Sequence, residues 1–88
     1  MASDPDMAAL LQAHNDLRQA RARHHARFLK RRGYLREGVT LAQATDILWT
    51  CTSDELYDLL VTQRDWSLPR FARFLADFMT TALLPPAQ

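Results

Sequence analysis

The stretch that decides the fold runs from Ala44 to Leu84 and reads ATDILWTCTSDELYDLLVTQRDWSLPRFARFLADFMTTALL. Apolar residues recur in it at helical spacing, without the alternation that is typical of strands. Ser53 and Ser67 stand between the apolar segments, and serine is a preferred residue at a helix N-cap. The whole chain has only two glycines and four prolines. We therefore expect an all-α protein.

Capping residues set the other helix boundaries. Asp4 is a good N-cap, and after Pro5 neither proline nor glycine occurs until Gly33, which predicts one helix over residues 5–32. Thr40 and a glutamine three residues later form a capping box. The prediction is a single domain over residues 1–88. Its long N-terminal helix is followed by three shorter helices at residues 40–52, 54–64 and 68–84.

Length and composition limit what the chain can be. A chain of 88 residues buries only about 60–65% of the surface that its unfolded form exposes, so its core is marginal. An apolar share of 48% excludes a disordered tail. No apolar run reaches the roughly 18 residues of a membrane span, and the N-terminus lacks the basic residues of a secretory signal. Cys51 is the single cysteine, so a cytoplasmic location is expected.

Charge is divided unevenly along the chain, although the formal net charge is only +1. Residues 1–38 carry eight Lys or Arg against four acids, a balance of +4, and residues 39–88 carry three against six, a balance of −3. Such asymmetry steers charged partners. The basic run RQARARHHARFLKRRGYLR (residues 18–36) favours nucleic acid. A helical wheel, however, spreads its cations around the helix, which favours an ordinary solvated surface.

The two C-terminal helices carry apolar faces that are wider than one neighbouring helix can cover. On the last helix these residues are Phe71, Leu75, Phe78 and Ala82, flanked by Leu68, Phe74 and Leu83. On the helix before it they are Leu56, Tyr57, Leu59, Leu60 and Val61. A two-fold axis would pair the helices of two chains into a four-helix bundle, so a homodimer is expected. The alternative is that the long first helix covers both faces.

The first helix has a mixed face. At 100° per residue, one arc of about 40° holds Leu10, Leu17, His24 and Phe28. Inside or beside that arc lie His14, Arg18 and Arg21. Unpaired charges are costly to bury. The arginines are therefore expected to reach water, acids of the second half, or a wet cavity.

Four short segments of the second half resemble the C-terminal end of TetR-family transcriptional regulators. They are Ile47–Ser53 (ILWTCTS), Asp54–Val61 (DELYDLLV), Arg64–Ser67 (RDWS) and the aromatic-rich segment Phe71–Leu84. Residues 5–38 are similar, less specifically, to the long helix and turn that precede this end. In the family, an N-terminal helix-turn-helix binds the operator, and effector binding to the C-terminal domain weakens operator binding. The last two helices form the dimer.

The resemblance implies two sets of functional residues. The dimer interface is expected to contain Leu56, Tyr57, Leu60, Phe71, Phe74, Leu75, Phe78, Met79 and Ala82. A pocket for a small-molecule effector is expected to be lined by His14, Arg18, Thr45, Leu48, Trp49 and Thr52. Trp49 and Tyr57 are the best aromatic candidates for pocket lining, and a structural role in the core is the alternative for both. Nothing in the sequence resembles a helix-turn-helix, so DNA binding by this chain alone is not expected.

No pattern in the sequence predicts an enzyme, a metal site or a cofactor. His14, His24 and His25 are ten and one residues apart, whereas metal ligands on a helix stand three or four apart. Cys51 has neither a second thiol nor a neighbouring base, so it is expected to be a small buried residue. Ser-His-Asp sets, paired carboxylates and Gly-rich phosphate loops are not found.

These patterns predict a cytoplasmic helical domain that acts by protein–protein association. Its expected role is that of the dimerisation and partial effector-binding region of a TetR-like transcriptional regulator. Two alternatives stay open. One is a free-standing helical protein that forms a heterodimer with an intact regulator. The other is a small basic nucleic-acid-binding protein that uses residues 18–36.

Overall fold

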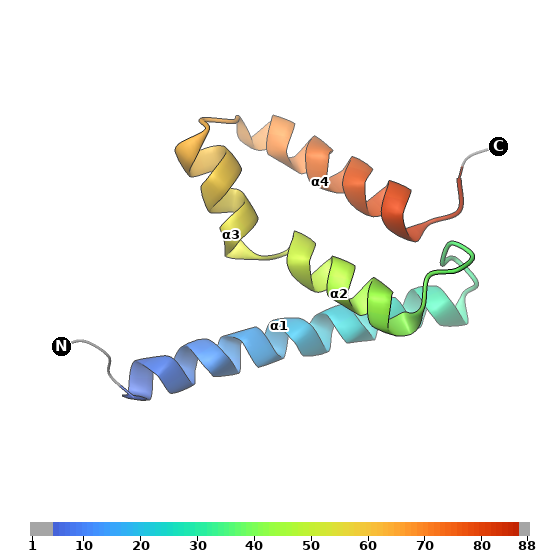
Figure 1. Cartoon of the computed structure of the whole chain (residues 1–88), viewed down its shortest axis with the longest axis horizontal. Coiled ribbons are helices and arrows are strands. Elements are labelled where there is room, and N and C mark those ends of the chain that lie inside the picture. Colours follow the sequence, from blue (N-terminus) through green and yellow to red (C-terminus); the bar gives the residue numbers. More distant parts are fainter. Residues whose placement is uncertain (1–4, 87–88) are drawn as a thin grey trace.

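The computed structural model describes residues 5–86, and these residues form helices joined by turns, without a strand (Figure 1). The elements in chain order are α1 (Pro5–Arg31), α2 (Leu41–Cys51), α3 (Asp54–Tyr57), η1 (Asp58–Gln63) and α4 (Leu68–Leu83). This confirms the all-α prediction and the long first helix. The predicted N-cap, Asp4, lies outside the described residues. Helix α2 lies along the second half of α1, and the helices after it fold back as a hairpin (Figure 1).

Helix α1 ends at Arg31, and the stop residue that the sequence predicts, Gly33, follows it. This residue has a φ of 72°, a conformation that only glycine adopts without strain. The Gly33 amide donates to Lys30 O (3.1 Å) and the Tyr34 amide donates to Leu29 O (2.9 Å), which is a Schellman motif. Lys30 and Arg31 place positive charge in the last turn, where the helix dipole favours it.

The connector after α1 is tied to the far end of the chain through Arg36. Its backbone amide donates to Leu83 O (2.6 Å), and its Nη1 donates to Thr81 O (2.8 Å). Both acceptors belong to the C-terminal turn of α4, where carbonyls lack helical partners and a cation is favourable. The contact closes the fold, because it joins the end of α4 to the turn between α1 and α2.

Helix α2 begins with the predicted capping box. The Gln43 amide donates to Thr40 Oγ1 (3.1 Å), and the Thr40 amide donates to Gln43 Oε1 (2.9 Å). The helix ends at Cys51, as the cluster of Thr and Ser residues predicts. Ser53 has the extended backbone of an N-cap at the start of α3, but its side chain makes no capping hydrogen bond.

A helix is present over residues 54–63, close to the predicted range of 54–64, but most of it is not α-helical. Only one turn, α3, is α-helical, and the backbone continues as the π-helix η1. Gln63 Nε2 donates to Asp58 Oδ2 (2.7 Å), a pairing five residues apart that suits the wider π turn and not the α-helix. The Trp66 amide then donates to Leu60 O (2.9 Å) and turns the chain towards α4.

Asp65 adopts a left-handed conformation in this turn, with a φ of 59°. A side chain in this region costs up to about 1–2 kcal/mol, less for Asp than for most residues. We expect Asp65→Gly to raise the free energy of unfolding by about 0.5–1 kcal/mol, and the melting temperature by roughly 4 °C. Thermal unfolding monitored by circular dichroism measures it. The matched control, Asp46→Gly inside α2, should instead lower stability by roughly 0.3–0.5 kcal/mol. A loss of stability in Asp65→Gly would contradict the strain argument.

The core is small and lies where α1, α2 and the end of α4 meet. Its buried members are Ala26 and Ala44, both 0% exposed, and Leu83, 3% exposed. The alanines let α1 and α2 approach closely, and Leu83 brings α4 onto them. Partly buried residues surround these three: Leu29, Leu35, Val39, Leu41, Ile47, Leu48 and Met79.

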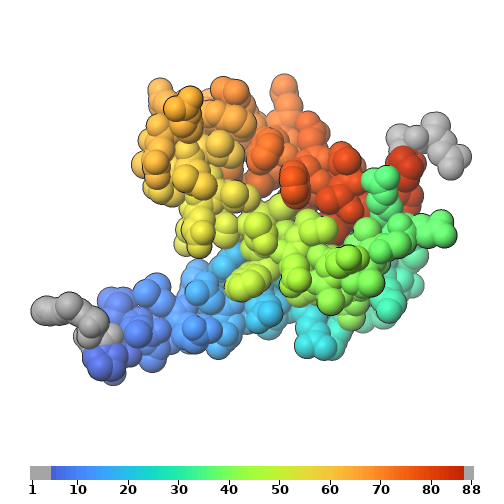
Figure 2. All heavy atoms as spheres, in the orientation of Figure 1, coloured from blue at the N-terminus to red at the C-terminus, as the bar shows by residue number. Residues whose placement is uncertain are grey.

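The apolar arc expected on α1 is not its packing face. Leu10 (66% exposed), Leu17 (51%) and Phe28 (44%) point to solvent, while Ala22 and Ala26 are buried. The helix packs through small residues because they fit the close contact with α2. Residues 5–17 are all exposed, and this half of α1 projects from the body of the molecule (Figure 2). Helix α1 therefore does not cover the apolar faces of the later helices.

The molecule is more extended than a globular chain of its length. Its radius of gyration is 15.5 Å and its extents are 55 × 30 × 16 Å, whereas a compact chain of this length has a radius of about 12 Å. Its accessible surface is 6910 Å². A compact monomer of 10.1 kDa exposes about 5,300 Å². The fold thus leaves on the order of 1,600 Å² more surface in solvent than its mass requires.

Candidate functional site

The outer face of α4 carries two exposed aromatic side chains, Phe74 and Phe78. Placed at 100° per residue, the apolar residues of α4 cover about half of its circumference. Leu83 at one edge of this arc is buried, while Phe74 (38% exposed) and Phe78 (50%) at the other edge face solvent. We call the exposed edge the α4 surface. It encloses a shallow hollow of about 380 Å³ lined by Phe74, Asp77, Phe78, Thr81 and Ala82.

Ring contacts hold the aromatic side chains of the hairpin in place. Tyr57 meets Phe71 edge-on, with 5.7 Å between ring centroids, and Phe74 meets Trp66 in the same way at 5.6 Å. The rings of Phe74 and Phe78 lie 6.1 Å apart. The Arg70 guanidinium lies 3.9 Å from the Trp66 ring centroid, which adds a cation–π contact. The α4 surface is therefore pre-organised, which lowers the entropic cost of binding a partner.

The nine residues predicted for the dimer interface divide into two groups. Tyr57 (44% exposed), Phe74 and Phe78 are exposed large side chains. The others are partly buried between the hairpin helices or towards α2: Leu56, Leu60, Phe71, Leu75, Met79 and Ala82. Met79 packs on the core, which gives it a structural role as well. The aromatic residues of the first group are the ones that a second chain can reach.

Four of the six predicted effector-pocket residues line one hollow of about 340 Å³, which we call the polar hollow. Its lining is His14, Arg18, Arg21, Ala22, His25, Leu48, Thr52 and Asp54. His14, Arg18, Leu48 and Thr52 are the residues predicted from the sequence, whereas Arg21, Ala22, His25 and Asp54 were not predicted. Arg21 and His25 could have been found, because residues 14, 18, 21 and 25 recur at helical spacing. Asp54 could not, because it comes from a separate element.

Arg18 connects α1 to the end of α2. Its Nη2 donates to the Trp49 carbonyl and to Thr52 Oγ1 (3.5 Å), and its Nη1 donates to Asn15 Oδ1 (3.3 Å). Its guanidinium carbon lies 5.8 Å from the Trp49 ring centroid. Two donors remain buried without an acceptor, Arg18 Nε and Trp49 Nε1. Trp49 therefore packs beside the arginine of the polar hollow and is not itself part of its lining.

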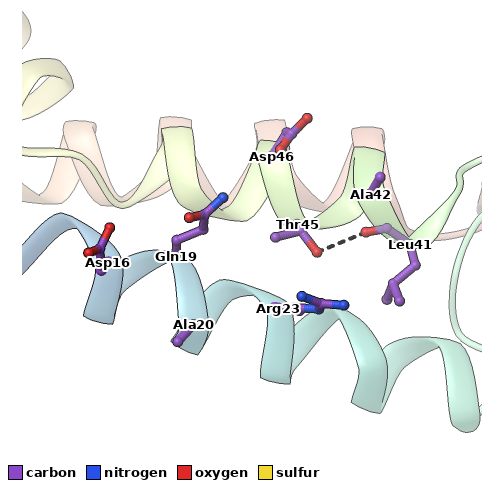
Figure 3. Close-up of a pocket in the computed structure, with 8 residues that line it drawn as sticks. All are labelled: Asp16, Gln19, Ala20, Arg23, Leu41, Ala42, Thr45 and Asp46. Atoms are coloured by element: carbon purple, nitrogen blue, oxygen red, sulfur yellow. Dashed lines mark hydrogen bonds between the residues drawn. The ribbon is translucent and has the colours of Figure 1, made fainter.

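Thr45 lies elsewhere. It is 7% exposed, and its hydroxyl donates to Leu41 O (2.8 Å) in its own helix. It borders a different hollow of about 530 Å³, shown in Figure 3, between the polar side of α1 and the start of α2. The side chains in that view are Asp16, Gln19, Ala20, Arg23, Leu41, Ala42, Thr45 and Asp46. The structure therefore does not bring Thr45 together with Arg18.

Cys51 is buried at the end of α2 and is 3% exposed. Desolvation by burial raises the pKa of its thiol above the ordinary value. The position is that of the small buried residue expected from the sequence. Among residues 5–86, no group of three or more His, Cys, Asp and Glu side chains is placed to hold a metal ion.

The burial of Cys51 predicts slow thiol chemistry. We expect iodoacetamide to alkylate Cys51 at least about tenfold more slowly in the folded protein than in urea, because the thiol is buried and kept protonated. The raised pKa has a second consequence for stability. The free energy of unfolding should be unaffected below the ordinary thiol pKa and should fall as the pH rises through it, because the unfolded chain ionises first. Urea titrations of wild type and Cys51→Ala at rising pH measure this, and an equal slope in both proteins would contradict it.

Comparisons with protein-family models, with curated proteins and with solved structures found no match to this chain. Within the described part of the chain, no helix is both long enough and apolar enough to cross a bilayer. The α4 surface and the polar hollow are therefore the two features of the molecule that indicate a function.

Proposed function

We propose that this chain is a dimerisation domain that pairs with a second copy through the α4 surface. The role is that of the C-terminal region of a TetR-like transcriptional regulator, with the polar hollow as this chain's share of an effector pocket. One observation carries the proposal: Phe74 and Phe78 stand one turn apart and exposed at one edge of the apolar arc of α4, whose opposite edge packs on the core through Leu83.

The chain exposes enough surface to form a protein–protein interface of standard size. A standard interface buries about 800 Å² on each partner. The excess surface of the chain as a whole, which includes the projecting half of α1, is on the order of 1,600 Å² and leaves room for such an interface. Burial of aromatic side chains dominates the energetics of such interfaces.

The composition of the surface favours a second copy as the occupant. The hollow of the α4 surface is rimmed by one acid, Asp77, and one hydroxyl, Thr81, around two aromatic rings and Ala82. A polar rim around an apolar centre is the usual anatomy of a protein interface. A two-fold axis near Phe78 would bring the α4 surfaces of two chains together. The aromatic rings of one chain would then contact those of the other, and the polar rim residues would stay in water.

The proposal is tested by sedimentation velocity on the full chain over a concentration series in the micromolar range. We expect a species of twice the 10.1 kDa chain mass that dissociates on dilution. Mixing the chain with an unrelated helical protein of similar size provides the control for non-specific association. A single species at the chain mass throughout the series would overturn the proposal.

A further inference from the structure

The polar hollow carries four side chains of basic type on one helix. His14, Arg18, Arg21 and His25 recur along α1 at intervals of four, three and four residues. The opposite wall is formed by Leu48, Thr52 and Asp54, of which Asp54 is the single acid in the lining. The volume of about 340 Å³ is at the lower end of the range of small-molecule pockets.

Arg18 is partly buried there without an anionic partner. Its acceptors, the Trp49 carbonyl, Thr52 Oγ1 and Asn15 Oδ1, are all neutral oxygens. Its Nε is buried and has no acceptor, and Nε1 of the adjacent Trp49 is in the same state. Burying a donor without its hydrogen bond is costly, more so when the donor is charged. The hollow is therefore lined by the charge of Arg18, for which no contact shown supplies an anionic partner, and a bound anion would supply one.

We propose that the polar hollow binds a small organic anion, and that Arg18 and Arg21 hold its carboxylate or phosphate group. Arginine suits this role because its planar fork pairs with the oxygens of either group in a bidentate manner. The apolar part of the ligand would lie against Leu48 and Ala22, which line the same hollow. The inference rests on the proposed function, since it names the chemical class of the effector.

The test is a nitrogen-15 NMR titration of the full chain at constant ionic strength. The probes are benzoate and phenyl phosphate, which distinguish the two anionic groups, and benzamide, the neutral analogue of benzoate. The reporters are the Nε–H signal of Arg18 and the indole N–H signal of Trp49, with the indole of Trp66 on the far hairpin as internal control. At least one anion should shift both reporter signals in a saturable manner. Its dissociation constant should be at least about tenfold lower than that of benzamide.

Three variants make the test specific. Arg18→Gln should weaken binding of the anion by about tenfold or more, and Arg21→Gln by roughly threefold to tenfold. Arg18→Gln loses the contacts of Arg18 to α2, which can destabilise the fold. Arg21 is exposed, so Arg21→Gln keeps the fold and tests the site in that case as well. The matched control is Arg23→Gln, because Arg23 is also exposed on α1 but borders the hollow of Figure 3. It should bind the anion within about twofold of wild type.

Equal shifts with benzamide and benzoate, or no saturable shift with either anion, would overturn the inference. So would an equal loss in Arg23→Gln and Arg21→Gln, because this would indicate a diffuse effect of net charge. Sedimentation of the same samples separates this result from the proposed function. If the chain is a dimer that binds neither anion, only the anion site is contradicted. If it is a monomer that binds one of the anions, only the proposed dimer is contradicted.

Discussion

Phe78→Asp is expected to convert the dimer to monomers at concentrations where the wild type is fully paired. Phe78 is 50% exposed in the single chain and lies at the centre of the α4 surface. In a two-fold dimer each substitution acts twice, because both copies would bring a desolvated carboxylate into an apolar contact. Loss of a hot-spot side chain at the centre of an interface costs about 2 kcal/mol or more. We therefore expect the dissociation constant to rise by at least about 100-fold.

Sedimentation velocity measures this change, and circular dichroism checks that the helices remain. The matched control is Phe28→Asp, since Phe28 is also an exposed phenylalanine (44%) but belongs to α1. That variant should dimerise with an affinity within a few-fold of wild type. If both variants dissociate equally, or if neither does, the α4 surface is not the interface.

Leu83→Ala is expected to have the largest effect on stability. Among residues 5–86, Leu83 is the one buried leucine, and it packs in one cluster with Ala26 and Ala44 at the point where α4 meets the other helices. Truncating a buried leucine costs about 2–5 kcal/mol, and the core here has few other members to compensate. For a domain of this size, that corresponds to a fall in melting temperature of roughly 10–20 °C or to loss of the fold.

Urea unfolding followed by circular dichroism gives the free energy directly. The control is Leu10→Ala, because Leu10 is 66% exposed on the projecting half of α1. It should change the stability by less than about 0.5 kcal/mol, which is usual for surface positions. Equal losses in the two variants would mean that α4 is not anchored through Leu83.

Local signals made the helix boundaries predictable. The Thr40 capping box and the Gly33 stop depend on residues within a few positions, and both occur in the structure. The π-helical segment was not predictable, because the DELYDLLV pattern fits an α-helix equally well. The packing face of α1 was predicted wrongly for a different reason. A leucine stripe indicates burial only if a partner helix is available, and α2 instead meets the alanine side of α1.

The candidate sites were predictable in part. The width of the apolar arc on α4 was visible in the sequence, and the structure leaves Phe74 and Phe78 exposed on it. The polar hollow combines residues of α1 with Asp54, and only the three-dimensional arrangement brings those together. Thr45 was predicted to line the same pocket as Arg18, but the orientation of α2 about its axis places Thr45 at the hollow of Figure 3.

The pairing of two chains through α4 is tested most directly by isotope-filtered NOE measurements on a mixture of labelled and unlabelled protein. Only contacts between different chains give signals in this experiment. We predict intermolecular signals from the Phe74 and Phe78 rings and from the Ala82 methyl group, and none from Phe28. Intermolecular signals confined to α1, or no such signals at a concentration where the sample sediments as a dimer, would contradict the account.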